Sequence, residues 1–216
     1  MAQWSQLIEI VLLSYYIAGV STLIGSMIGL PIGAFLGTKR FKGKFAIKTL
    51  IFTFYGFPPV VMGLIVFLLL SSSGPMGFLD FLYTPWAMIV AETFLATPLI
   101  IGITMTSVGS IDHNVKDLVR SLGVSKARAL FLYLKEARSG IATAVMIGFG
   151  SCISEVGAAM MVGGNIEGHT RVMTTAIVLE TRMGNFQTAM FLGAILLATT
   201  CIIYLAFVLL EGKRDD

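Results

Sequence analysis

The chain has 216 residues, of which 56% are hydrophobic and only 12% are charged, and its net charge is +3. Soluble globular domains carry about a quarter charged residues, so this composition excludes a soluble globular domain and indicates an integral membrane protein. With only two histidines, a histidine-rich metal or catalytic centre is excluded. We expect the two cysteines, Cys152 and Cys201, to be small buried residues rather than a disulfide or a metal site.

Two apolar runs open the chain. Residues 10–38 form an uncharged segment that is long enough to cross about 30 Å of hydrocarbon. We therefore expect a first span over about 10–37. A second span is expected over about 46–71, where Pro58 and Pro59 predict a break at membrane depth. Small residues recur every fourth position in the first run and predict close packing against another helix, at Gly25, Gly29, Gly33 and Gly37.

Three further spans are expected over about 85–108, 140–162 and 186–210. We therefore expect an all-α, single transmembrane domain over residues 1–216, with about five spans and no soluble regulatory domain. The loops at 38–48 and 109–139, with the C-terminal tail, hold 13 of the 15 basic residues. The positive-inside rule then places these segments in the cytoplasm, the C-terminus with them, and the N-terminus outside.

The longest polar stretch, residues 112–141, has apolar residues at helical spacing. Gly123 is expected to end one helix, and Ser125 to cap the start of a second. One hypothesis is a basic amphipathic loop that lies on anionic lipid. The other is a docking helix that takes force from a soluble partner.

The second hypothesis is favoured by a resemblance. Asp117-Leu118-Val119-Arg120-Ser121-Leu122-Gly123, followed by Glu136-Ala137-Arg138, resembles the cytoplasmic signature loop of ABC importer permeases, with Asp117 where that family has Glu. Ser154-Glu155-Val156-Gly157 and Val162-Gly163-Gly164-Asn165 resemble the molybdate/tungstate branch. Phe57-Pro58-Pro59 and Tyr83-Thr84-Pro85-Trp86 are most similar to its tungstate members.

The resemblance implies a type I ABC importer fold in the cell membrane, a permease dimer, cytoplasmic ATPase subunits and an extracytoplasmic oxyanion-binding protein. The permease would import tungstate by alternating access. It would be no enzyme and hold no cofactor, with ATP and magnesium on the ATPase. The implied ATPase-coupling residues are Asp117, Leu118, Val119, Arg120, Ser121, Leu122, Gly123 and Val124.

Candidates for the translocation path or gate lie between residues 151 and 187. Hydroxyl and guanidinium donors suit a tetrahedral oxyanion, whereas a carboxylate repels one. We therefore expect Glu155, and Glu92 likewise, to support or gate the path rather than bind substrate. Two methionines are candidates for an apolar constriction, with ordinary helix packing as the alternative. The candidates are Ser154, Glu155, Met160, Met161, Thr170 and Arg171, and an outer interfacial helix is expected within 165–187.

Alternatives remain open at this point. The substrate could be molybdate or another oxyanion. A different class of function is a secondary carrier or channel that works without ATP, although no convincing inverted repeat is visible. A membrane enzyme is disfavoured because the chain has no nucleophile or acid–base motif. The chain also lacks a phosphate-binding loop, since the glycine and lysine spacing around Gly43-Lys44 does not fit one.

Overall fold

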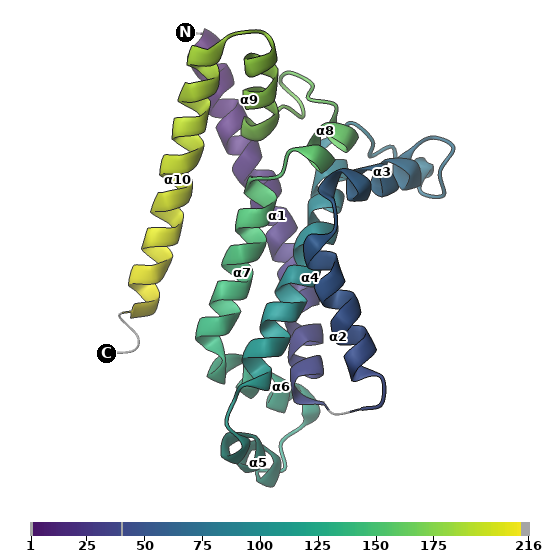
Figure 1. Ribbon diagram of the computed structural model, residues 1–216, viewed down its shortest axis with the longest axis vertical. Coiled ribbons are helices and arrows are strands. Elements are labelled where there is room, and N and C mark those ends of the chain that lie inside the picture. The colour runs from purple at the N-terminus through teal and green to yellow at the C-terminus, as the bar shows by residue number, and fades with distance from the viewer. Residues whose placement is uncertain (1, 40, 213–216) are drawn as a thin grey trace. The chain divides into compact units, whose positions relative to one another are not determined.

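The computed structural model describes residues 2–39 and 41–212, and side chains over 5–39, 41–119 and 121–209. Every regular element in these ranges is a helix (Figure 1). The α-helices are α1 Ala2–Thr38, α2 Lys44–Thr53, α3 Pro59–Leu70, α4 Pro85–Gly109, α5 His113–Ser121, α6 Lys126–Glu136, α7 Arg138–Ile153, α8 Gly157–Gly163, α9 Met173–Arg182 and α10 Phe186–Gly212, with 3-10 turns at Phe54–Gly56 and Gly77–Leu79.

Helices α1, α4 and α10 are each long and apolar enough to cross a membrane. Two pairs of helices reach this length only together, each across a sharp bend. The pair α2 and α3 bends by 99° around Phe57 and Pro58, and the pair α7 and α8 bends by 57° at residues 154–156. The described residues thus offer three spans, or five if each bent pair counts as one, and the chain is a multi-pass membrane protein.

The first of these breaks follows from the sequence, because a proline lacks the N–H of a helix and restricts the residue before it. The second break was not predicted. Residues 140–162 were expected to form one span, yet α7 ends at Ile153 and α8 begins at Gly157. No proline lies at this break.

The helices contribute to two compact units, each assembled from separate parts of the chain. Unit 1 comprises residues 1–21, 58–92 and 150–216, and unit 2 comprises residues 22–57 and 93–149. Because α1, α4 and α7 each supply residues to both, neither unit is a separate stretch of sequence.

In unit 2, the glycine stripe of α1 packs directly on α4, as its spacing predicted. A Cβ added at Gly33 would lie 2.6 Å from the carbonyl oxygen of Ile101, and one at Gly37 would lie 2.8 Å from that of Met105. Only a glycine allows this close approach of two helix backbones.

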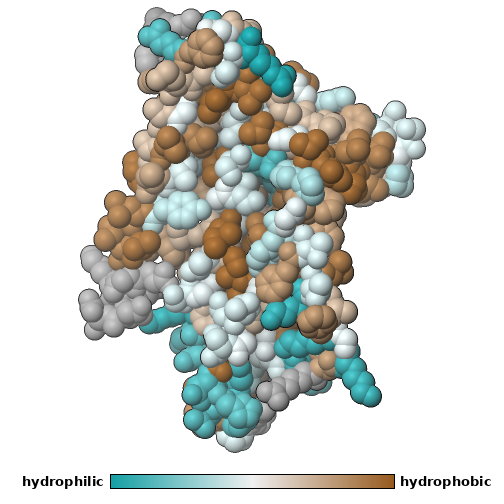
Figure 2. Space-filling view, viewed as in Figure 1, coloured by the Kyte–Doolittle hydropathy of each residue, from teal (hydrophilic) through white to brown (hydrophobic). Residues whose placement is uncertain are grey.

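In unit 1, α3 packs against α8, and α9 against α10. Gly63 of α3 permits the first contact, because a Cβ there would lie 2.8 Å from Cα of Ala158. Much of α10 remains uncovered by the rest of the chain, and apolar side chains are widely exposed on the surface (Figure 2). The expectation that Cys201 is buried was therefore wrong, since it lies on exposed α10, whereas Cys152 is buried as predicted.

Candidate functional site

The polar stretch at 112–141 folds into the expected pair of helices within unit 2. Asp112 directly precedes α5, and its Oδ1 accepts a hydrogen bond of 2.7 Å from the Asn114 N–H. Gly123, with φ of +62°, reverses the chain after α5. Ser125 then caps α6, its Oγ accepting from the Arg128 N–H at 3.4 Å. The predicted helix boundary and both turn residues are thus confirmed.

One face of this pair is anchored. Val119 of α5, 8% exposed, and Tyr133 of α6 are buried in a cluster with Ala34 of α1 and Val108 of α4. Lys116 Nζ donates to the carbonyl of Gly109 at 2.8 Å, which ties α5 to the end of α4. The pair is therefore attached to two spanning helices by apolar packing and by hydrogen bonding.

The opposite face of the pair carries apolar side chains that are exposed at the surface of the chain. Leu118 and Leu122 are 60% and 61% exposed, and Phe131 of α6 is 65% exposed. Asp117 lies on the same helix, with its Oδ2 3.6 Å from His113 Nε2. Exposed leucines on a polar, anchored helix pair indicate a contact surface for another protein or for lipid.

The structure divides the predicted coupling residues into two groups. Asp117, Leu118 and Ser121 of α5 are exposed, as are Leu122 and Gly123 in the turn, with Val124 half-buried there. Val119 is buried against α1 and α4 and so anchors the pair instead of facing outward. Arg120 lies in α5, but its side chain is outside the described residues.

The second candidate site is the break between α7 and α8 in unit 1. Glu155 lies within it, and its Oε1 accepts a hydrogen bond of 3.0 Å from the N–H of Ala158 in the first turn of α8. Carboxylates stabilise helix N-termini in this way because the first N–H groups have no partner within the helix. Ser154 Oγ donates back to the carbonyl of Gly150 at 2.6 Å. Both residues stabilise the ends of the interrupted helix.

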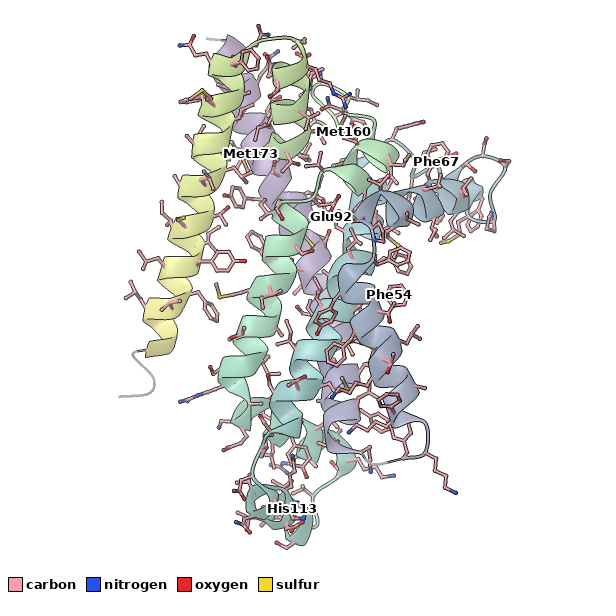
Figure 3. The ribbon with its side chains drawn as sticks, in the orientation of Figure 1. Phe54, Phe67, Glu92, His113, Met160 and Met173 are labelled. Atoms are coloured by element: carbon pink, nitrogen blue, oxygen red, sulfur yellow. The ribbon has the colours of Figure 1, made fainter. Side chains whose placement is uncertain are left out.

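A second carboxylate, Glu92 of α4, lies beside this break (Figure 3). Cys152 Sγ contacts its backbone carbonyl at 3.8 Å. Its carboxyl group is buried and hydrogen-bonded to the Ser21 side chain, and it lies near Glu155. Two neighbouring carboxyl groups bring no positive charge to an oxyanion, and their supporting role stays a prediction.

The loop from Gly163 to Arg171 is closed by one threonine. Thr170 is fully buried, and its Oγ1 donates to the carbonyl of Gly163 at 2.6 Å and accepts from the Ile166 N–H at 2.9 Å. Its only hydroxyl proton is therefore used within the loop. In this conformation Thr170 supports the loop and offers no donor to an anion.

Arg171 is paired rather than solvated. Its Nη1 donates to Glu167 Oε2 at 3.0 Å, while its Nε is buried with no hydrogen-bond partner among the described residues. A helix is present within the predicted range as α9, directly after this loop, and its outer position stays a prediction. Arg171 lines a groove at the start of α9, separate from the break at Glu155.

The two candidate gate methionines lie on α8 and are both half-buried. The Met161 side chain packs near Gly63 of α3, where an added Cβ would lie 3.0 Å from Met161 Cβ. Met160 lies on the same short helix as Met161 (Figure 3). Their contacts fit helix packing, and a role as an apolar constriction remains a prediction.

Sequence reasoning missed the contribution of Thr174 of α9. Its buried Oγ1 donates to the backbone carbonyl of Glu155 at 2.8 Å, which attaches α9 to the break. The only available signal was Thr174-Thr175 at the start of an apolar run, a pattern that does not identify the partner.

Comparisons with known proteins place the fold and the family. Residues 29–214 match the model of the family described as "Binding-protein-dependent transport system inner membrane component". The "Probable anion ABC transporter permease protein" of Haloferax volcanii is 41% identical over 197 residues, which cover 89% of this chain and 85% of that protein. The "Tungstate uptake system permease protein TupB" of Peptoclostridium acidaminophilum is 36% identical over 203 residues, covering 92% and 89%.

Permeases named for molybdenum are less similar, at 25% to 31% identity. Among solved structures, an inward-facing MetNI methionine ABC transporter chain matches with a TM-score of 0.79 at 19% identity, over 97% of this chain and 96% of that one. This likeness shows a shared fold.

Proposed function

Because the chain belongs to the family of binding-protein-dependent transport system inner membrane components, we propose that it is the permease of an ATP-driven tungstate importer. A binding protein would deliver the anion outside the cell, and a separate cytoplasmic ATPase would supply energy. The permease itself would carry no nucleotide and perform no chemistry.

The anchored helix pair α5–α6 is the observation that carries the proposal. Leu118 and Leu122 are exposed while Val119, between them, is buried against α1 and α4. A force applied to the exposed face of the pair would therefore be transmitted through packed side chains to two spanning helices. This arrangement suits an ATPase that pushes or pulls on the permease and gives no advantage to a channel without an energy source.

The proposed substrate rests on relatives and on the charges at the break. Proteins named for tungstate uptake are 35% and 36% identical to this chain, more than those named for molybdenum. Glu92 and Glu155 bring no positive charge to an oxyanion, and selectivity would lie mainly in the binding protein. Molybdate remains the alternative substrate, because it is also a doubly charged tetrahedral oxyanion.

Two further parts of the proposal concern assembly and orientation. A single set of about five spans is small for enclosing a path, so two copies would pair about a two-fold axis with the path between them. By the positive-inside rule, the basic residues at 38–48 and 109–139 support a proposed orientation in which these loops and the C-terminus lie in the cytoplasm and the N-terminus lies outside. Lys213 and Arg214 of the C-terminal tail lie outside the described residues.

Substrate-stimulated ATP hydrolysis tests the substrate. The chain would be reconstituted in liposomes with its ATPase and binding protein, and the rate compared with tungstate, molybdate and sulfate. We expect tungstate to stimulate hydrolysis at the lowest concentration. Equal stimulation by molybdate would refute the tungstate preference, and stimulation by sulfate alone would refute the molybdate/tungstate branch.

A further inference from the structure

A groove of about 920 Å³ opens in unit 1, where the N-terminal part of α1, α9 and the start of α10 come together (Figure 1). Its lining also includes the loop at 167–171. Of the residues considered above for coupling, path or gate, only Arg171 lines it. The transport mechanism therefore leaves this groove unexplained.

The groove changes from apolar to charged along α1. The part of the groove farther from the N-terminus is lined by Leu12 and Tyr16 of α1, together with Phe191 of α10. All three side chains are exposed and lie within stretches apolar enough to cross a membrane. The rim of the groove carries Glu9, one turn before Leu12, together with polar side chains of the loop and of α9. A gradient of this kind fits an amphiphile, with its chains beside the spanning helices and its headgroup at the interface.

The rim has an excess of negative charge. Three carboxylates, from Glu9, Glu167 and Glu180, and one guanidinium, from Arg171, line the groove, so carboxylates outnumber guanidinium groups there by two. Glu167 is already bonded to Arg171 and to the Gln6 amide, each at 3.0 Å. The excess therefore lies at Glu9 and Glu180, and it favours a cationic group.

Neither of these two carboxylates is paired with a basic side chain among the residues that the structure describes. Among the described residues, Glu9 has no hydrogen-bond or ion-pair partner, and Glu180 accepts only from the neutral amide of Asn185, at 2.9 Å. A primary ammonium has three N–H donors and can bond to both carboxylates, whereas a quaternary ammonium has none.

Arg171 supplies the complementary requirement. Its side chain lines the groove and is 19% exposed, with Nη1 bonded to Glu167. A guanidinium has five N–H donors, and phosphodiester oxygens are acceptors that it favours.

We propose that this groove binds a phospholipid whose headgroup carries a primary ammonium, of the ethanolamine type. The ammonium would contact Glu9 and Glu180, a phosphodiester oxygen would accept from the exposed part of the Arg171 guanidinium, and the acyl chains would lie along Tyr16 and Phe191. With the N-terminus outside, as in the proposed orientation, this lipid belongs to the outer leaflet.

The test is lipid binding measured by native mass spectrometry. The delipidated full-length chain, with its co-purifying subunits, would be titrated in detergent with phosphatidylethanolamine, phosphatidylcholine and phosphatidylglycerol of identical acyl chains. We expect phosphatidylethanolamine to bind roughly fivefold more tightly than phosphatidylglycerol, which is the scale set by two partly exposed ion pairs. The double variant Glu9→Gln/Glu180→Gln should lose this preference.

Asp80→Asn is the matched control. It also removes a carboxylate from unit 1, does not line the groove, and keeps a residue that tolerates the positive φ of 50° found there. We expect the control to retain the lipid preference, and Arg171→Gln to weaken binding of all three phospholipids. Equal or tighter binding of phosphatidylglycerol, no saturable binding, or an unchanged preference in the double variant would overturn the proposal.

Discussion

The hydroxyl of Thr174 in α9 donates a hydrogen bond of 2.8 Å to the backbone carbonyl of Glu155. The carboxylate of the same glutamate accepts from the N–H of Ala158 in α8. Glu155 therefore joins two helices at the point where α7 is interrupted. This connection is a physical route by which α9 and α8 would move together.

The first prediction concerns this link. Thr174→Val keeps the shape of the buried side chain but leaves the Glu155 carbonyl without its donor, which costs about 1–3 kcal/mol for a buried group. We expect a lower unfolding temperature of the purified complex and a changed number of anions moved per ATP. Thr174→Ser retains the hydroxyl and should behave like the wild type. Equal behaviour of the valine and serine variants would exclude a role for the bond.

The second prediction separates the charge of Glu155 from its hydrogen bond. Glu155→Gln keeps an oxygen that accepts from the Ala158 N–H, but replaces the ionisable carboxyl group by a neutral amide. We expect the proposed permease dimer to remain intact and the basal ATP hydrolysis rate to change, because the break then lacks the ionisable group of Glu155. Glu155→Ala removes the acceptor as well and should also destabilise the fold. Unchanged hydrolysis and uptake in the glutamine variant would leave the charge without a role.

The third prediction concerns the turn between α5 and α6. Gly123 has φ of +62°, and a Cβ there would meet nothing within 4 Å, so backbone conformation alone requires glycine. Gly123→Asn should be tolerated, because asparagine adopts this conformation readily. Gly123→Pro cannot adopt it, and we expect weaker ATPase binding and uncoupled transport with the membrane part still assembled. Co-purification of the ATPase measures this, and equal yields for both variants would contradict the docking role.

The fourth prediction concerns the packing of α1 on α4. Gly33→Ala places a Cβ 2.6 Å from the Ile101 carbonyl, which forces the helices apart and costs about 1–3 kcal/mol. Gly19→Ala is the matched control on the same helix, since a Cβ there meets nothing within 4 Å. Thermal unfolding in detergent should show a loss for the first variant and none for the second. Equal stability of the two variants would show that the close approach is not needed.

The sequence predicted the elements whose causes are local. Apolar spacing, Gly123 and Ser125 were sufficient for the α5–α6 pair, and the repeated glycines were sufficient for a close helix contact. Apolar spacing, Gly123 and Ser125 act through neighbours within a turn or two of the chain. The glycine repeat predicts a packing face but does not identify its partner.

The missed features depend on contacts between distant residues. The break at 154–156 contains no proline, and its stabilisation by Glu155 and Thr174 becomes visible only when α8 and α9 are in place. The groove at Arg171 needs residues as far apart as Gln6 and Glu167. The exposure of Cys201 was missed because membrane helices have no need to bury apolar side chains within one chain, since lipid surrounds them.

The central claim is that ATP hydrolysis by a partner drives anion uptake through this chain. The partner would act on the exposed face of α5 and the turn that follows it. ATP-dependent accumulation of tungstate in proteoliposomes, for the wild type and for Leu118→Asp/Leu122→Asp, tests it most directly. We predict accumulation that requires ATP, the ATPase and the binding protein, and that is lost in the variant, whose changes are confined to exposed side chains. Equal accumulation by the variant, or accumulation without ATP, would contradict the account.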